Sequence, residues 1–238
     1  MPDFADIWSY LARGPLLWLT LTLVAYSVAD LIAEQAGRKP LANPVLIAVI
    51  LLAAMLWATG TPYAVYFEGA QFVHFLLGPA TVALAVPLYL QGARLRRAIL
   101  PVFAGLVCGS VVAITSALAI ARALGVDAQT LASLAPKSTT APVAIGIAQA
   151  LGGSPTLAAV LVILTGITGA LIVTPLMNAL RITDWRARGL AVGTAAHGIG
   201  TARALQVNPT AGAFAGIGMG LNAILTALIA PAILKLFL

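Results

Sequence analysis

The chain has 238 residues, of which 61% are hydrophobic and only 8% are charged, whereas soluble domains carry about 25% charged residues. This composition excludes a soluble globular protein and predicts an all-α polytopic membrane protein, with one transmembrane domain over residues 1–238. The net charge of +6 is concentrated in short connectors between apolar runs, which is typical of the cytoplasmic face of a membrane protein and not of a nucleic-acid-binding surface.

The apolar runs predict seven helices and one irregular segment, since a spanning helix needs about 20 apolar residues. The helices are expected at 15–35, 43–60, 76–92, 98–122, 155–180, 189–206 and 210–236, with the irregular segment at 130–151. This segment is either a re-entrant segment or a broken crossing helix. The positive-inside rule favours the re-entrant form, because all basic connectors then share one face and the C-terminus lies inside.

The same topology divides the chain into two three-helix units, 43–122 and 155–236, which begin on opposite faces of the membrane. Such an inverted repeat is typical of secondary transporters, whose binding sites lie where helices are interrupted near the middle of the bilayer. The interrupted helices are therefore the places to search for a site.

The first interruption falls in the helix predicted at 76–92. A Gly-Pro pair ending at Pro79 can begin a half-helix, and Pro87 frees a carbonyl group of the preceding turn. Thr81 could contact a ligand or only hydrogen-bond within its own helix. Upstream of them, Glu68 is a candidate proton carrier, and an interfacial charge is the alternative.

The second interruption is the most informative stretch of the chain. Between two prolines, Pro136 and Pro142, stand one lysine and three hydroxyl residues: Lys137, Ser138, Thr139 and Thr140. Because Pro142 has no N–H for the carbonyl of Ser138, we expect an unwound loop followed by a half-helix. A helix N-terminus binds anions and Lys137 adds a full positive charge, so this stretch predicts an anion site. A lysine that extends from a surface loop is the alternative.

The third interruption falls in the helix predicted at 189–206. Small residues, His197 and Thr201 recur there every four positions, so the histidine faces the protein interior, and Gly198 can break the helix locally. His197 could carry a proton, hydrogen-bond a carboxylate or pack as a structural residue. Arg203 could pair with a substrate or lie at the membrane interface. Asn222, the amide residue of the last helix, is a further candidate, as is Asn43.

Four stretches, at 43–46, 76–89, 135–142 and 193–202, resemble the signature sequences of the LrgB/CidB family. The resemblance extends from about residue 15 to the end of the chain. The family often has valine where Thr139 stands, so the hydroxyls of Ser138 and Thr140 are expected to matter more.

The resemblance implies two different functions. Bacterial members are described as antiholin-like proteins of the cytoplasmic membrane, linked to murein hydrolase activity and autolysis, and often encoded beside a smaller LrgA/CidA partner. A chloroplast relative transports glycolate and glycerate, and bacterial members have been tied to pyruvate and related acids. Neither function requires a cofactor or a metal.

We therefore carry two hypotheses. In the first, the chain is a proton- or ion-coupled transporter of small monocarboxylates. Lys137 and the half-helix at Pro142 neutralise the carboxylate, the neighbouring hydroxyls and Thr81 bind its other oxygens, and His197 or Glu68 couples a proton. In the second, it is an antiholin-like regulator that binds an LrgA/CidA-like partner, and a homo-oligomer such as a dimer fits either. An enzyme is not expected, because the sequence lacks H-E-x-x-H and G-x-S-x-G motifs.

Overall fold

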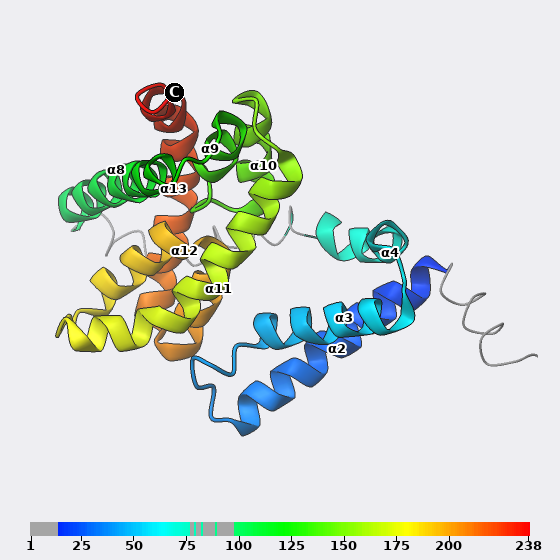
Figure 1. Ribbon diagram of the computed structural model, residues 1–238. Helices are drawn as coiled ribbons and strands as arrows, with labels where there is room; N and C mark the ends of the chain where they lie inside the picture. The colour runs from blue at the N-terminus through cyan, green and yellow to red at the C-terminus, as the bar shows by residue number, and fades with distance from the viewer. Residues whose placement is uncertain (1–13, 77–78, 80–81, 83–88, 90–97) are drawn as a thin grey trace, which may run out of the picture. The chain divides into compact units, whose positions relative to one another are not determined.

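The computed structural model describes residues 14–76, 79, 82, 89 and 98–238, and all regular secondary structure in these residues is helical (Figure 1). The chain divides into two compact units, residues 1–83 and 84–238, which are treated separately here. The first unit contains α2 (Pro15–Gln35), α3 (Pro44–Thr59) and α4 (Tyr63–Phe75). The second contains α8 (Ile99–Ala123), α9 (Ala128–Leu134), α10 (Ala141–Ala150), α11 (Pro155–Ala179), α12 (Trp185–Val207) and α13 (Pro209–Leu234).

Four of these helices, α2, α8, α11 and α13, are long and apolar enough to cross a membrane. Their bounds lie within two residues of the helices predicted at 15–35, 98–122, 155–180 and 210–236. The prediction of an all-α polytopic membrane protein is confirmed. The helix predicted at 76–92 lies mostly outside the described residues, and α4 was not predicted.

In the first unit, α2 packs against both α3 and α4. Gly69 of α4 allows the close approach to α2, because a methyl group added there would come within 2.8 Å of the Leu19 nitrogen. Trp18 is fully buried and meets the Tyr66 ring edge-on at 5.9 Å. Asn43 begins α3 as its N-cap, where its side-chain oxygen accepts hydrogen bonds from the nitrogens of Val45 and Leu46.

In the second unit, the segment from α9 to α10 enters and returns. The backbone nitrogen of Ser154, which caps α11, donates a 2.7 Å hydrogen bond to the hydroxyl of Ser133 near the end of α9. The chain therefore returns to its starting level after 21 residues, and the turn lies between α9 and α10. This geometry confirms the prediction that 130–151 is re-entrant.

The helix predicted to cross the membrane at 189–206 does not cross it. Gly189 packs against the carbonyl of Ala211, and Gly212 packs against Leu205, whose Cα would lie within 2.8 Å of a methyl group added at Gly212. In a straight helix residues 189 and 205 would be about 24 Å apart, yet here they contact adjacent residues of α13. The reversal occurs at Ala196 and His197, whose backbone angles are not helical. Thus α12 is a second re-entrant hairpin with arms 185–196 and 198–207.

This correction also changes the direction of α13. The start of α8 packs with the start of α13, through Val102 and Phe214, and the ends pack together, through Leu118 and Ile233. The two helices therefore run parallel, and the C-terminus lies on the face opposite the basic connector 181–188. The expectation that both share the cytoplasmic face is wrong, because it counted α12 as a crossing.

The two hairpins enter from opposite faces. The α9–α10 hairpin begins where α8 ends, and the α12 hairpin begins where α11 ends, on the face of the 181–188 connector. A long helix followed by a hairpin thus occurs twice in opposite orientation. The repeat units predicted at 43–122 and 155–236 do not coincide with these two helix-and-hairpin segments. The division of the chain into those units stays a prediction.

Candidate functional site

The tips of the two hairpins meet at Asn222, which lies halfway along α13 and is 1% exposed. Its amide nitrogen donates to the carbonyl of Ser138 at 3.0 Å, on the first hairpin, and to the carbonyl of Thr194 at 3.1 Å, on the second. Its amide oxygen accepts from the hydroxyls of Ser110 at 2.6 Å and Thr226 at 3.2 Å. Both donors and the acceptor of this side chain are therefore used.

Both carbonyl groups that Asn222 binds have lost their ordinary helical donors. In a continuous helix the Ser138 carbonyl would accept from residue 142, but Pro142 has no N–H. The Thr194 carbonyl would accept from Gly198, which lies beyond the reversal of α12. An unpaired buried carbonyl costs about 1–3 kcal/mol, so one amide stabilises both interruptions.

The tip of the first hairpin carries the predicted anion-binding residues. The Lys137 ammonium donates to the Ser138 hydroxyl at 3.1 Å and is half-buried. The fully buried Thr139 donates its hydroxyl to the Pro136 carbonyl at 2.9 Å, so this hydroxyl is used within the loop. Thr140 is the N-cap of α10, but its side chain makes no capping bond. Lys137, Ser138 and Thr140 therefore remain the candidates for ligand contacts.

The tip of the second hairpin is built around His197. Its backbone has φ 42° and ψ −134°, a region that L-residues rarely adopt. Its ring nitrogen Nε2 lies 2.8 Å from the carbonyl of Val162 in α11. Since a carbonyl oxygen only accepts, Nε2 carries the proton and Nδ1 is left for another partner. Gly166 makes room for the ring, because a methyl group there would come within 2.6 Å of Cε1.

The residues around His197 divide into structural and open positions. The Thr201 hydroxyl donates to the His197 carbonyl at 2.7 Å, which stabilises the turn. Gly198 is half-buried, and a methyl group there would meet only the Met219 sulfur, at 3.9 Å. Lys137 also interacts electrostatically with His197, so the charged group of one tip acts on the titratable group of the other.

These elements place polar groups near the middle of the membrane. Ser110 and Asn222 lie halfway along α8 and α13, two helices long enough to span a bilayer. The N-terminus of α10 and Lys137 supply positive charge there. No group of three His, Cys, Asp or Glu side chains that could hold a metal ion occurs in the residues the structure describes. The arrangement suits a small anion.

A groove of about 510 Å³ runs between α8 and the first arm of α12. It extends from Ala98 and Arg186, at the face of the 181–188 connector, to Thr194. The Thr194 hydroxyl is buried and has no hydrogen-bond partner in the described part of the chain, while the Thr194 carbonyl is bound by Asn222. The groove therefore leads from the basic face to the residues that join the two tips.

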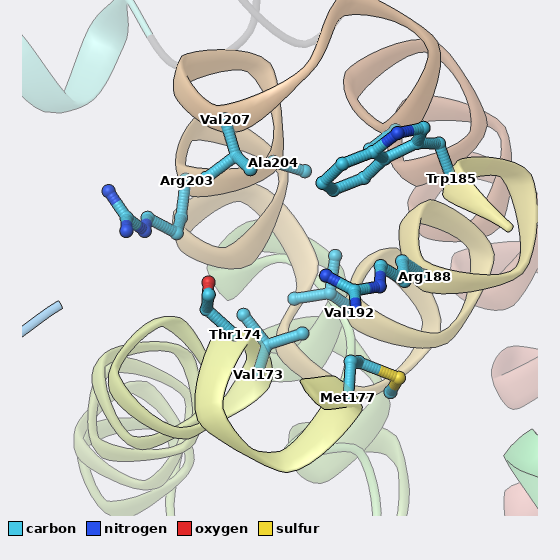
Figure 2. A pocket seen from close by; sticks show the side chains of 10 residues that line it. Val173, Thr174, Met177, Trp185, Arg188, Val192, Arg203, Ala204 and Val207 are labelled. Atoms are coloured by element: carbon cyan, nitrogen blue, oxygen red, sulfur yellow. The ribbon is translucent and has the colours of Figure 1, made fainter. Parts of the chain in front are cut away.

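The remaining predicted residues lie elsewhere. Glu68 is exposed on α4 and Pro79 is exposed, and both belong to the first unit together with Asn43, which caps α3. Their part in the site stays a prediction, and Thr81 lies outside the described residues. Arg203 lines a separate cleft at the base of the α12 hairpin (Figure 2).

Four residues of the site were not predicted from the sequence. Ser110, Thr194 and Thr226 complete the hydrogen bonds around Asn222, and Gly166 accommodates His197. Hydroxyls and glycines are frequent in these helices, so no signal in the sequence distinguished these four from their neighbours.

Comparisons with known proteins identify the family of the chain. The model of the LrgB-like family matches residues 22–236. The chain is 33% identical to the holin-like protein CidB of Staphylococcus epidermidis, over 93% of this chain and 96% of that protein. It is 36% identical to the uncharacterized protein YxaC of Bacillus subtilis, over 92% of this chain and 95% of that one. No solved structure matches. The chain is therefore an integral protein of the bacterial cytoplasmic membrane and belongs to the LrgB-like family.

Proposed function

We propose that the chain is a secondary transporter of small monocarboxylates, driven by a proton or ion gradient. The observation that carries this proposal is the meeting of two hairpin tips, from opposite faces, at a polar site halfway through the membrane. Secondary transporters place substrate sites at such interruptions, because broken helices expose backbone groups and helix ends there.

A carboxylate fits the charge of this site. Lys137 is the charged side chain at the tips, and inserting a lysine into the bilayer costs about 2.5–3.5 kcal/mol, so a retained lysine needs a partner or a function. Its ammonium and the N-terminus of α10 neutralise the carboxylate. The hydroxyls of Ser138 and Thr140 bind the second oxygen function of a hydroxy or keto acid, and Gly198 leaves room beside His197 at the second tip. The substrate class is that of glycolate, glycerate and pyruvate.

His197 is the proton carrier of this proposal. The bond from Nε2 to Val162 fixes the ring, so Nδ1 can take up a proton without a change of orientation. A bound carboxylate offsets the charge of Lys137 and favours the protonated ring, which couples proton binding to substrate binding. Access alternates as the hairpins move against the long helices, and the groove that ends at Thr194 is the route from the basic face.

Uptake into proteoliposomes tests the proposal. The purified protein is assayed with radiolabelled glycolate, glycerate, pyruvate, lactate and acetate, with and without a pH gradient. Lys137→Ala should lower uptake about 10- to 100-fold, since hydrogen bonds to charged groups contribute about 1.5–3 kcal/mol. Lys137→Arg tests whether charge alone suffices. Arg122→Ala, which removes an exposed charge at the end of α8, should leave uptake unchanged. If the wild type takes up none of the five acids, the proposal is wrong.

A holin-like regulator is the second candidate, and the names of the relatives favour it more directly than the transporter. The similarity to CidB proteins extends over nearly the whole chain. In this function the groove between α8 and α12, which small residues such as Gly105, Gly109 and Ala191 line, takes a helix of a membrane partner of the LrgA/CidA kind. Such a partner should co-purify and change the leakage of dye-loaded vesicles, whereas Lys137→Ala should not affect that leakage. Both candidates are non-enzymatic.

A further inference from the structure

Thr194 lies at the inner end of the groove between α8 and the first arm of α12. It is 5% exposed, and its carbonyl is bound by the amide nitrogen of Asn222, which also binds the carbonyl of Ser138 at the first hairpin tip. Thr194 and Ser138 are therefore close to each other, on either side of one amide group. A small molecule at the inner end of the groove lies near both residues.

The hydroxyl of Thr194 lacks the hydrogen bond that comparable hydroxyls make. Eight serine and threonine hydroxyls in the described helices donate to the carbonyl four residues earlier. Two of them, Ser110 and Thr201, are buried like Thr194 and donate at 2.7 Å. The Thr194 hydroxyl has no partner in the described part of the chain, neither the Leu190 carbonyl nor any other group. Because an unpaired buried polar group destabilises the fold, this exception indicates a ligand.

The surroundings of Thr194 leave its side chain room to turn. It lies between two glycines, since a methyl group added at Gly109 of α8 would be 3.4 Å from Cγ2, and one added at Gly218 of α13 would be 3.1 Å from Oγ1. The methyl group of Thr194 thus faces α8 across the groove, and the hydroxyl faces α13. No side chain at Gly109 opposes a rotation about the Cα–Cβ bond, and threonine in a helix populates two rotamers. Such a rotation turns the hydroxyl toward the groove.

The groove offers few other side chains that could bind a polar ligand. Apart from Thr194, its polar side chains are Asp184 and Arg186, which pair with each other at the face of the 181–188 connector. The inner end therefore has one hydroxyl among apolar side chains. A hydroxyl both donates and accepts hydrogen bonds, so it can bind either a hydroxyl group or a keto oxygen.

We propose that the Thr194 hydroxyl binds the 2-hydroxyl or 2-keto oxygen of the substrate and selects such acids over plain alkanoic acids. This inference rests on the proposed transporter function and adds a contact from the second hairpin to those of the first. The Ser138 hydroxyl accepts from Lys137 at 3.1 Å and keeps its own proton for the substrate. A 2-hydroxyl group then accepts from Ser138 and donates to Thr194, whereas a 2-keto oxygen accepts from both. Acetate has neither group and leaves the Thr194 hydroxyl unpaired.

The test compares acids that differ by one hydroxyl group. Uptake of glycolate and acetate, and of lactate and propionate, is measured in proteoliposomes with the wild type and with Thr194→Val, which keeps the shape of the side chain without its hydroxyl. The wild type should take up each hydroxy acid with the higher kcat/KM, and Thr194→Val should lower this preference about tenfold. Thr115→Val removes a hydroxyl that is already bonded to the Val111 carbonyl of α8, and should keep the wild-type preference.

Stability separates a binding role from a structural one. Removal of an unpaired buried hydroxyl should not destabilise the fold, so Thr194→Val should melt at or above the wild-type temperature. Thr194→Ser and Thr194→Ala give a second comparison if the valine variant does not fold, because they differ from each other only in the hydroxyl. Of these two, only the serine variant should keep the preference for hydroxy acids.

Three outcomes would overturn the inference. In the first, Thr194→Val keeps the wild-type preference for hydroxy acids while the wild type transports them. In the second, Thr194→Val melts at a lower temperature and loses uptake of both acids of a pair in the same proportion, which shows a structural role. In the third, the wild type takes up none of the acids, and the transporter function itself fails together with this inference.

Discussion

The two re-entrant hairpins reach the same place in the membrane by different means. The α9–α10 hairpin turns between two prolines, and its loop is closed by its own contacts, such as the bond from Thr139 to the Pro136 carbonyl. The α12 hairpin has no proline at its turn. It reverses at His197, whose ring is held by α11, and its arms fit against α13 through glycines such as Gly189 and Gly193.

This difference separates a turn fixed by local sequence from a turn fixed by its neighbours. The first tip should keep its shape when the surrounding helices change, because proline restricts the backbone itself. The second tip should respond to any change in α11 or α13. Asn222 connects the two, since its amide binds one carbonyl on each tip.

Removal of the shared contact should give the largest effect. Asn222→Ala leaves the carbonyls of Ser138 and Thr194 without a donor, and each unpaired group costs about 1–3 kcal/mol. We expect the free energy of unfolding in detergent to fall by about 2–5 kcal/mol and substrate uptake to be lost. Thr226→Val, which removes only one bond to the Asn222 oxygen, should cost about 1 kcal/mol. Equal losses in the two variants would show that the two tips do not depend on Asn222.

A substitution in α11, which holds the ring of His197 at the second tip, should give the next largest effect on stability. Gly166→Ala places a methyl group within 2.6 Å of the His197 ring and should destabilise the protein by about 1–3 kcal/mol. Gly146→Ala, on α10 of the first hairpin, meets no atom within 4 Å and should instead stabilise it by about 0.5–1 kcal/mol. Thermal unfolding of the two variants measures the difference. Effects of the same sign would contradict the contrast between the hairpins.

The backbone of His197 allows a finer test of the second tip. At φ 42° a side chain is strained, whereas glycine is not. Both His197→Ala and His197→Gly lose the bond to Val162, so they differ only at the backbone. We expect the glycine variant to be more stable than the alanine variant by about 1 kcal/mol. If alanine is the more stable, the reversal does not occur at this residue.

The same contrast explains what the sequence could predict. The proline pair predicts the interruption within 130–151, because proline acts on its own backbone, and the positive-inside rule favours its re-entrant form. The four-residue repeat of glycine, His197 and Thr201 instead predicts one small-residue face on a crossing helix, with a local break at Gly198, and not a reversal of the chain. The sequence does not show the reversal, because glycines that fit against Ala211 and Ala215 of α13 would suit a crossing helix as well as an arm of a hairpin. Only the packing of α12 on α13 distinguishes the two. Because α12 was counted as a crossing helix, the C-terminus was predicted on the wrong face of the membrane.

Asn222 shows the same limit within the site. Its position as an amide in an apolar helix made it a candidate, but its partners lie 84 and 28 residues away in sequence. Pro142 predicts that the Ser138 carbonyl needs a donor and cannot say which residue supplies it. Composition and proline positions therefore predict where a buried carbonyl lacks a hydrogen-bond donor. Only the packing of the helices determines which residue donates to it.

The base of the α12 hairpin should give the smallest effect. Asp184 caps α12 by accepting from the Arg186 nitrogen at 2.8 Å, and the Arg186 guanidinium pairs with the same carboxylate. Asp184→Ala should lower the free energy of unfolding by about 1 kcal/mol, the usual effect of a lost N-cap. Asp184→Asn keeps the capping oxygen and loses only an exposed ion pair, so it should stay close to the wild type at neutral pH.

The pH dependence of these variants distinguishes the cap from the ion pair. Hydrogen bonds from the Arg186 side chain and backbone lower the pKa of Asp184 to about 2. Because the folded pKa lies below the unfolded value of about 3.9, the ionised carboxylate stabilises the fold above pH 4. This stabilisation is lost as the pH falls through about 2. The difference between the wild type and Asp184→Asn should therefore be constant from pH 5 to 8 and shrink below about 4. A difference that persists at about pH 2 would show that the ion pair does not contribute to the base of the hairpin.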